Sequence, residues 1–76
     1  MKVRYCLRRD TVAFGLTEVT TYGIDAFAEN GGLAMSIIDI SFNCNAVIQL
    51  IENLNKYRVE LIHLLDIIYD FYCDSC

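Results

Sequence analysis

One histidine and two aspartates near the C-terminus have a spacing at which they could act together. His63, Asp66 and Asp70 follow one another at intervals of three and four residues, which places them on one face of a helix. Such a group could offer one nitrogen and two carboxylates to a metal ion, or act as a general acid or base. The surrounding residues are mostly Leu, Ile and aromatic, so a solvated polar stripe explains the same pattern. We therefore expect no metal site here.

The cysteines raise a second possibility. Cys73 and Cys76 have the CxxC spacing of redox and zinc sites. They follow the predicted end of a helix, where the partial negative charge disfavours a thiolate and hence redox chemistry. A zinc site would need two more ligands, and Cys6 and Cys44 are predicted on separate elements. We expect free thiols and no cofactor, and keep metal binding or thiol redox chemistry as an alternative.

No other signature of an enzyme is present. The sequence has a single histidine, no nucleophile elbow and no glycine-rich phosphate loop. The Gly31-Gly32 pair is accounted for by a hairpin turn. We therefore predict no catalytic residues and no enzymatic activity.

Composition restricts the partners and the location. The 76 residues, with ten acidic and six basic side chains and a net charge of −4, predict one domain over residues 1–76. An acidic chain of this kind is a poor ligand for nucleic acid. No apolar run reaches the roughly 20 residues that a membrane span needs, and the charged N-terminus does not fit a signal peptide. We predict a cytoplasmic protein that binds neither nucleic acid nor membrane.

Asn30-Gly31 is the clearest turn signal, because both residues tolerate the positive φ angles of a two-residue type I′ hairpin. The predicted cross-strand pairs are Ala28 with Leu33, Ala26 with Met35, Ile24 with Ile37 and Tyr22 with Asp39. This register gathers apolar side chains on one face of the hairpin. We expect the helices to cover that face.

Alternation over Val3–Leu7 predicts another strand of the same sheet. The segment Thr11–Thr17, which Gly15 interrupts, fits either a short strand or a loop. A helix is predicted from about Cys44 to Lys56. Its apolar stripe is formed by Val47, Leu50, Ile51 and Leu54. Strands followed by helices predict an α+β fold, in which two C-terminal helices pack on a small antiparallel sheet of about three strands.

The C-terminal segment from Glu60 to Cys73 predicts a helix with more apolar surface than one sheet can cover. Its apolar residues spread over about two-thirds of the helix circumference, whereas a neighbouring sheet covers about half. We therefore expect this helix to join two copies in a homodimer, or to bind a different protein. The predicted contact residues are Leu61, Leu64, Leu65, Ile68, Tyr69 and Tyr72.

Three short segments resemble a family of short, uncharacterised bacterial proteins. They are Tyr22-Gly23-Ile24, Ile38–Ser41 and the helical segment from Ile62 to Phe71, which match YGI, IxDIS and IHxxDxxxDF patterns. The resemblance implies a hairpin followed by two helices, in this order. It implies no activity.

Together these observations favour a small non-enzymatic interaction or regulatory module that dimerises through its C-terminal helix. A small acidic inhibitor encoded on a mobile element, for example an inhibitor of a defence nuclease, is an alternative. Metal or thiol chemistry at the CxxC segment is a further alternative.

Overall fold

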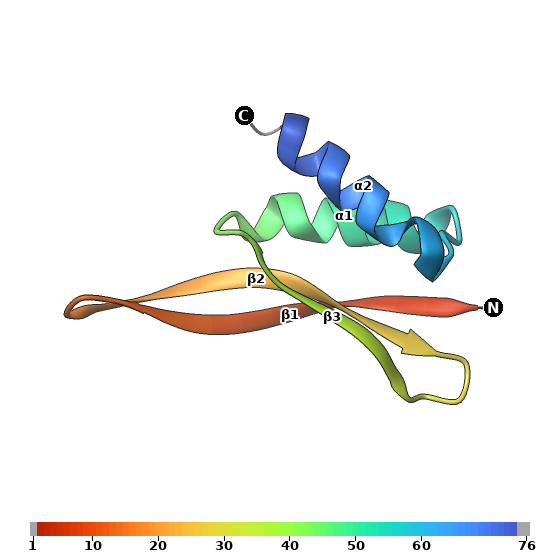
Figure 1. Cartoon of the computed structure of the whole chain (residues 1–76), viewed down its shortest axis with the longest axis horizontal. Coiled ribbons are helices and arrows are strands. Elements are labelled where there is room, and N and C mark those ends of the chain that lie inside the picture. The colour runs from red at the N-terminus through yellow and green to blue at the C-terminus, as the bar shows by residue number, and fades with distance from the viewer. Residues whose placement is uncertain (1, 75–76) are drawn as a thin grey trace.

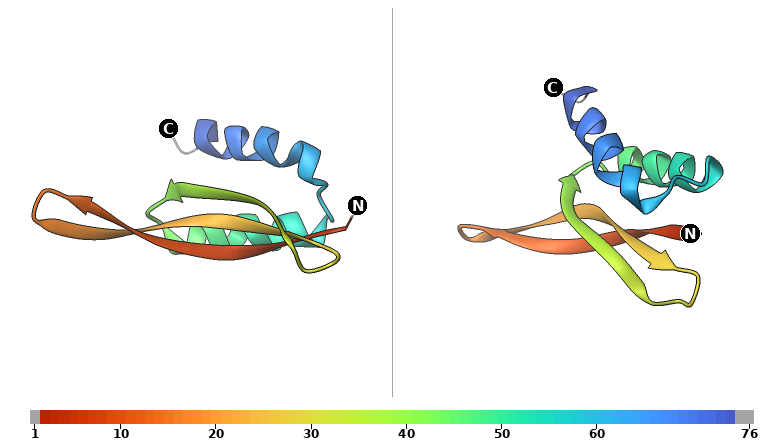
Figure 2. Two further views of the ribbon diagram at one scale, coloured as in Figure 1. Left: turned by 60° about the horizontal axis from the view of Figure 1, so that its bottom comes forward. Right: turned by 45° about the vertical axis from the view of Figure 1, so that its right-hand side comes forward.

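The computed structural model describes residues 2–74, with side chains for residues 2–72. Three strands form one antiparallel sheet in the order β1-β2-β3, and two helices follow. The elements are β1 (Val3–Phe14), β2 (Thr17–Ala28), β3 (Leu33–Ser41), α1 (Cys44–Lys56) and α2 (Leu61–Asp74). Both helices lie on the same side of the sheet (Figures 1 and 2). The predicted α+β fold of three strands and two C-terminal helices is confirmed.

β1 and β2 form a long hairpin that extends beyond the helices (Figure 1). Their register runs without interruption from Val3 opposite Ala28 to Phe14 opposite Thr17. Gly15, with φ of 62°, takes the left-handed position of the two-residue turn, as a type II′ turn requires of its first central residue. The segment that fitted either strand or loop is therefore the end of this ribbon.

The centre of the predicted β2–β3 register is confirmed, but both ends are wrong. The observed pairs are Ile24 with Ile37, Ala26 with Met35, Phe27 with Leu33 and Tyr22 with Ser41. The predicted pairing of Ala28 with Leu33 and of Tyr22 with Asp39 does not occur. Each error comes from an irregularity in β3, where the register shifts.

The β2–β3 turn is longer than predicted. Gly31 has φ of 87°, whereas Asn30 is not left-handed, so the type I′ turn is wrong. The Gly31 N–H donates to the Ala28 carbonyl, and the Ala28 N–H donates to the Gly32 carbonyl, each at 2.9 Å. These bonds close a three-residue turn in which glycine takes the one left-handed position.

β3 kinks near its end. Asp39 has φ of 57°, and the Thr21 hydroxyl donates to its Oδ1 at 2.7 Å. A Cβ atom at Gly23 would overlap the carbonyl oxygen of Ile37, so only glycine fits on β2 opposite the kink. The YGI and IDIS segments therefore meet at one structural feature, the kink of β3.

α1 has the predicted bounds. The Asn43 side chain accepts a hydrogen bond from the Ala46 N–H at 3.2 Å, which satisfies one of the free donors at the helix start. The apolar stripe packs on the sheet. Its members Val47, Ile51 and Leu54 are buried in the same core as Tyr5, Ile24, Ala26 and Ile40.

Tyr5 fastens the end of α1 to β1. Its backbone N–H donates to Asn55 Oδ1, and its carbonyl accepts from Asn55 Nδ2, both at 3.0 Å. Its hydroxyl donates to the Val59 carbonyl at 2.7 Å. The Asn55 amide thus takes the place of a neighbouring strand at this point of the β1 edge.

Gly23→Ala tests the kink. We expect the variant to lose about 3 kcal/mol or more of unfolding free energy in urea, because the new Cβ meets backbone that cannot move independently. Gly15→Ala is the control, since its Cβ meets nothing within 4 Å and only the left-handed conformation costs about 1 kcal/mol. Equal losses in the two variants would contradict the steric requirement at Gly23.

Asn55→Ala tests the link between α1 and β1. The substitution removes both hydrogen bonds to the backbone of Tyr5, so we expect a loss of about 2–3 kcal/mol in urea unfolding. Asn53→Ala is the control on the same helix, because its side chain is exposed and should change stability by about 0.5 kcal/mol or less. A small effect at both positions would show that the amide bridge does not stabilise the fold.

Candidate interaction surface

One side of α2 belongs to the core of the chain. Leu64 and Ile68 are 0% and 3% exposed, and Leu61 is partly buried against the same cluster. Leu64 and Ile68 were predicted to contact a partner, but they contact the core of their own chain and are not available to one. The periodicity of the helix could not distinguish these two situations, because core and interface both need apolar side chains.

A second side of α2 is apolar and exposed. We call it the lateral strip, and it consists of Ile62, Leu65, Tyr69 and Tyr72, which are 78%, 58%, 68% and 40% exposed. Their spacing places them in one row along the helix. Three of the predicted contact residues therefore lie on this strip. Ile62 was missed, although it follows the same spacing.

The lateral strip lies on the side of α2 next to β3. Leu65 and Met35 line one shallow hollow of about 450 Å³, and Tyr72 lies close enough to Asp39 to sense its charge. Both Met35 and Asp39 belong to β3, so α2 runs along this strand, as Figure 2 also shows. Among the described strands, β3 pairs only with β2. The strip therefore borders an open strand edge.

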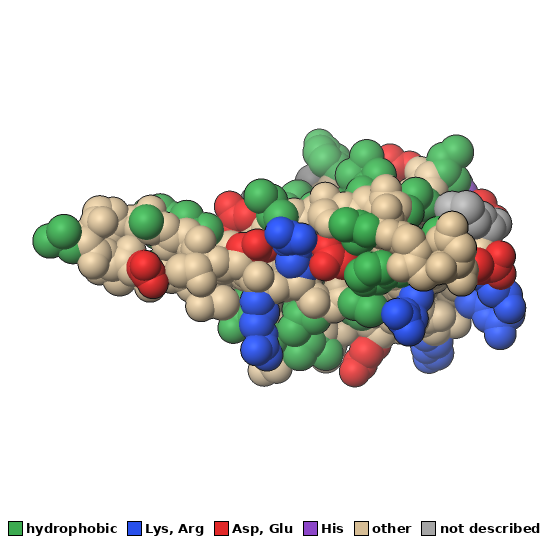
Figure 3. Space-filling view, turned by 90° about the horizontal axis from the view of Figure 1, so that it is seen from below, with side chains coloured by type: hydrophobic (Ala, Val, Ile, Leu, Met, Phe, Trp, Pro, Cys, Tyr) green, Lys and Arg blue, Asp and Glu red, His purple; other side chains and the backbone are tan. Residues whose placement is uncertain are grey.

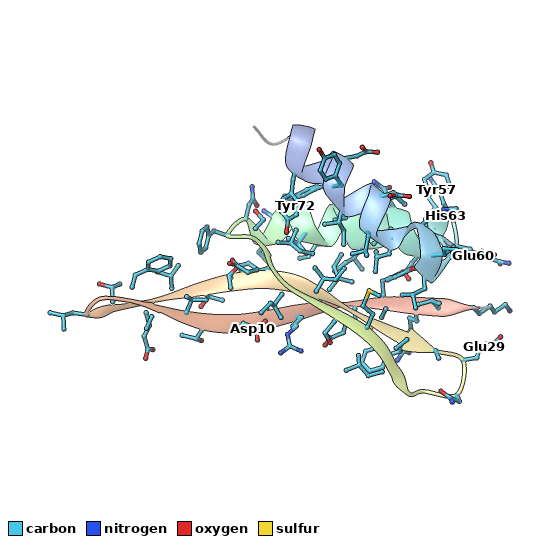
Figure 4. The ribbon with its side chains drawn as sticks, in the orientation of Figure 1. Asp10, Glu29, Tyr57, Glu60, His63 and Tyr72 are labelled. Carbon is cyan, nitrogen blue, oxygen red and sulfur yellow. The ribbon has the colours of Figure 1, made fainter. Side chains whose placement is uncertain are left out.

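The polar residues of α2 form a third row. His63, Asp66 and Asp70 are all exposed, and helical spacing places them opposite the buried side. Figure 4 shows His63 near Glu60 at the start of the helix, with Tyr72 toward its other end. This arrangement is that of a solvated stripe.

No metal centre is formed by the side chains of residues 2–72: no three His, Cys, Asp or Glu among them are grouped to hold an ion. Cys6 and Cys44 are free thiols and partly buried. The CxxC segment lies outside the described residues, because the side chain of Cys73 and the whole of Cys76 are not described.

The face of the sheet opposite the helices carries charges of both signs (Figure 3). Arg8 binds both carboxylate oxygens of Asp10, at 2.8 and 3.1 Å, and reaches Asp25 at 3.3 Å. The Ser36 hydroxyl also donates to Asp25. The hydrogen bond to Asp10 is the main cause that raises the pKa of Arg8. This cluster links all three strands, which is a structural role.

A protein-family model described as "Family of unknown function (DUF6514)" matches residues 1–74. The chain belongs to the DUF6514 family. The expected membership in a family without an assigned activity is confirmed. No curated protein and no solved structure matches this DUF6514 chain. Within its described residues, no helix is long and apolar enough to cross a membrane.

The tyrosines predict how stability depends on pH. Burial raises the pKa of Tyr5, and burial together with the charge of Asp39 raises the pKa of Tyr72. The folded chain therefore holds these protons more tightly than the unfolded chain, whose tyrosines have a pKa of about 10. Stability that is fully present below pH about 10 is lost as the pH rises above it.

Tyr72→Phe isolates the contribution of Tyr72. Because phenylalanine does not titrate, the urea midpoint of the variant should fall less steeply than that of the parent between pH of about 9 and 11. The change of midpoint with pH is the measurement, so a constant difference between the two proteins does not affect it. Identical slopes would show that Tyr72 has the same pKa in the folded and unfolded chains.

Proposed function

We propose that this DUF6514 protein is a non-catalytic cytoplasmic interaction module that forms a homodimer through the lateral strip of α2 and the free edge of β3. The observation that carries the proposal is the strip itself, a row of four large apolar side chains that the chain leaves exposed. Contiguous apolar surface of this kind marks interaction sites in soluble proteins. A second copy is the occupant that we favour.

The area favours an interface larger than the strip. Four side chains that are 40–78% exposed supply roughly half of the ~800 Å² that each partner contributes to a standard interface. The neighbouring β3 strand adds Leu33 and Ile38, which are 57% and 58% exposed. In a two-fold dimer, the strip and the β3 edge of one copy would face the same strip and edge of the other copy, because two-fold symmetry uses the same surface on both chains.

The hydrogen-bond pattern identifies the backbone groups that β3 offers. Tyr5 bonds to Asn55 and not to β2, so Ala26, its partner on β2, directs its backbone groups toward β3. The backbone groups of Met35, opposite Ala26, therefore bond to β2. The next residue, Ser36, directs its N–H and carbonyl to the free edge of β3. Antiparallel pairing of two β3 strands around Ser36 would satisfy these groups. It would also bring the two α2 helices side by side.

The acidic residues of α2 are compatible with this arrangement. Asp66 and Asp70 lie beside the strip on the side of the helix that is turned away from the sheet. A dimer formed through the strip leaves both carboxylates hydrated and avoids the large cost of burying an unpaired charge. A dimer formed instead through the side of α2 that carries Asp66 and Asp70 would bring the carboxylates of the two copies together, where they repel each other.

The mass in solution tests the proposal. Light scattering behind a sizing column should give twice the chain mass of 8.7 kDa for the parent, and one chain mass for the double variant Leu65→Asp, Tyr69→Asp. The new charges would be desolvated and unpaired in the dimer, whereas both side chains are exposed in the single chain.

Leu16→Asp is the matched control. Leu16 is the most exposed large apolar side chain among residues 2–72, at 108%, but lies at the tip of the β1–β2 hairpin, so its variant should keep the mass of the parent. A parent that remains monomeric over the concentration series would contradict the homodimer and indicate that a different protein covers the lateral strip. A double variant that keeps the mass of the parent would show that the dimer uses another surface.

A further inference from the structure

A second hollow has no lateral-strip residue on its wall and lies where β1 begins and the β2–β3 turn approaches the α1–α2 connection. Its volume is about 670 Å³, which is in the range of sites for small ligands. Glu29 and Glu60, both on its wall, mark its location in Figure 4. The Asn55 amide, which is fixed by Tyr5, also lines it.

Three of the six basic residues of this acidic chain line the hollow. They are Lys2 and Arg4 at the start of β1, and Arg58 in the α1–α2 connection. The ion pairs of the described residues are made by Arg8, and none joins these three cations to a carboxylate. With Glu29 and Glu60 on the same wall, three positive charges against two negative charges leave a net charge of +1. That balance suits a ligand with a single negative charge better than a polyanion.

The wall also has an apolar part. The guanidinium of Arg4 lies over the ring of Phe27, at 5.9 Å from the ring centroid, and this contact orients the cation. Val3 and Ala28 add further apolar side chains to the wall. A ligand that fits this hollow therefore has an apolar body as well as an anionic group.

Arg58 has a backbone conformation that the fold would obtain more cheaply from another residue. Its φ is 50°, and it occupies the position after α1 where glycine is usual. Its N–H donates to the Asn55 carbonyl at 3.2 Å, and the Val59 N–H donates to the Leu54 carbonyl at 3.0 Å, which is the Schellman pattern. Glycine would make the same backbone bonds and avoid a cost of about 1 kcal/mol.

Among the described residues, no hydrogen bond or ion pair of the Arg58 side chain offsets this strain. Strain that the fold does not need is found where function requires a side chain. We infer that the hollow binds a small organic monocarboxylate with an apolar or aromatic body, and that Arg58 is its principal anion contact. A guanidinium matches the two oxygens of a carboxylate with parallel hydrogen bonds. Arg4 and Lys2 add positive charge to the same wall.

Benzoate and benzamide are a matched pair of probes, because they have the same ring and differ in charge. Titration of each into the full chain, followed by the NMR shifts of the backbone amides, should give saturable shifts at the hollow with benzoate. Benzamide should bind at least about tenfold more weakly, because it lacks the charge-assisted bond to Arg58. Equal affinity for the two probes would overturn an anion site.

Arg58→Gly is the decisive variant, because it is expected to change stability and binding in opposite directions. Its urea midpoint should rise as the left-handed strain is removed, while its affinity for benzoate falls at least about tenfold. Arg58→Lys, which keeps both the charge and the strain, should retain part of the affinity. Unchanged affinity in Arg58→Gly would overturn the proposal, and a variant no more stable than the parent would remove the argument from strain and with it the assignment of Arg58.

This inference is independent of the homodimer. Arg58 lies outside the lateral strip, so Arg58→Gly should leave the mass in solution unchanged. Loss of benzoate binding with an unchanged mass supports the carboxylate site alone. A monomeric parent that binds benzoate would overturn the dimer and leave the carboxylate site standing.

Discussion

The paired hydrogen bonds between the backbone of Tyr5 and the side chain of Asn55 hold the two halves of this fold together. They join residues 50 positions apart and fix the end of α1 against the first strand. The Tyr5 hydroxyl then binds Val59, which sets where the chain leaves α1 and where α2 starts. This anchor fixes the connection from which α2 starts, and so contributes to the position of α2 and of its lateral strip along β3.

A second anchor holds the other end of α1. The kink of β3, made by the close approach at Gly23 and the bond from Thr21 to Asp39, precedes the N-cap at Asn43. α1 is therefore tied at both ends to the sheet, whereas α2 is held chiefly by apolar side chains such as Leu64 and Ile68. α2 also has a second apolar side, the lateral strip. A partner that covers this side would stabilise the helix further by removing its apolar surface from water.

Sequence patterns within a few residues were enough to predict α1 and the β2–β3 hairpin. The N-cap candidates before Cys44 and the apolar periodicity together predicted α1, and alternation with the Asn-Gly signal predicted the centre of the β2–β3 register. The kink could not be predicted, because it rests on Thr21 and Asp39, residues on different strands. The division of α2 into a buried side and an exposed side was also beyond periodicity, since both are apolar. The strain at Arg58 has no sequence signature at all, because arginine is an ordinary residue near the end of a helix.

The two edges of the sheet differ in how they are protected, and this supports β3 as the place of association. β1 carries Arg4, Arg8 and Arg9, and charged side chains discourage further pairing on an edge strand. Asn55 also occupies the backbone of β1 at Tyr5. β3 has neither device: its single charged residue is Asp39 at the kink. The irregularities of β3 leave a regular stretch from Met35 to Ile37 for pairing. A strand from a second copy that pairs there would bring with it the apolar helix face that the lateral strip needs.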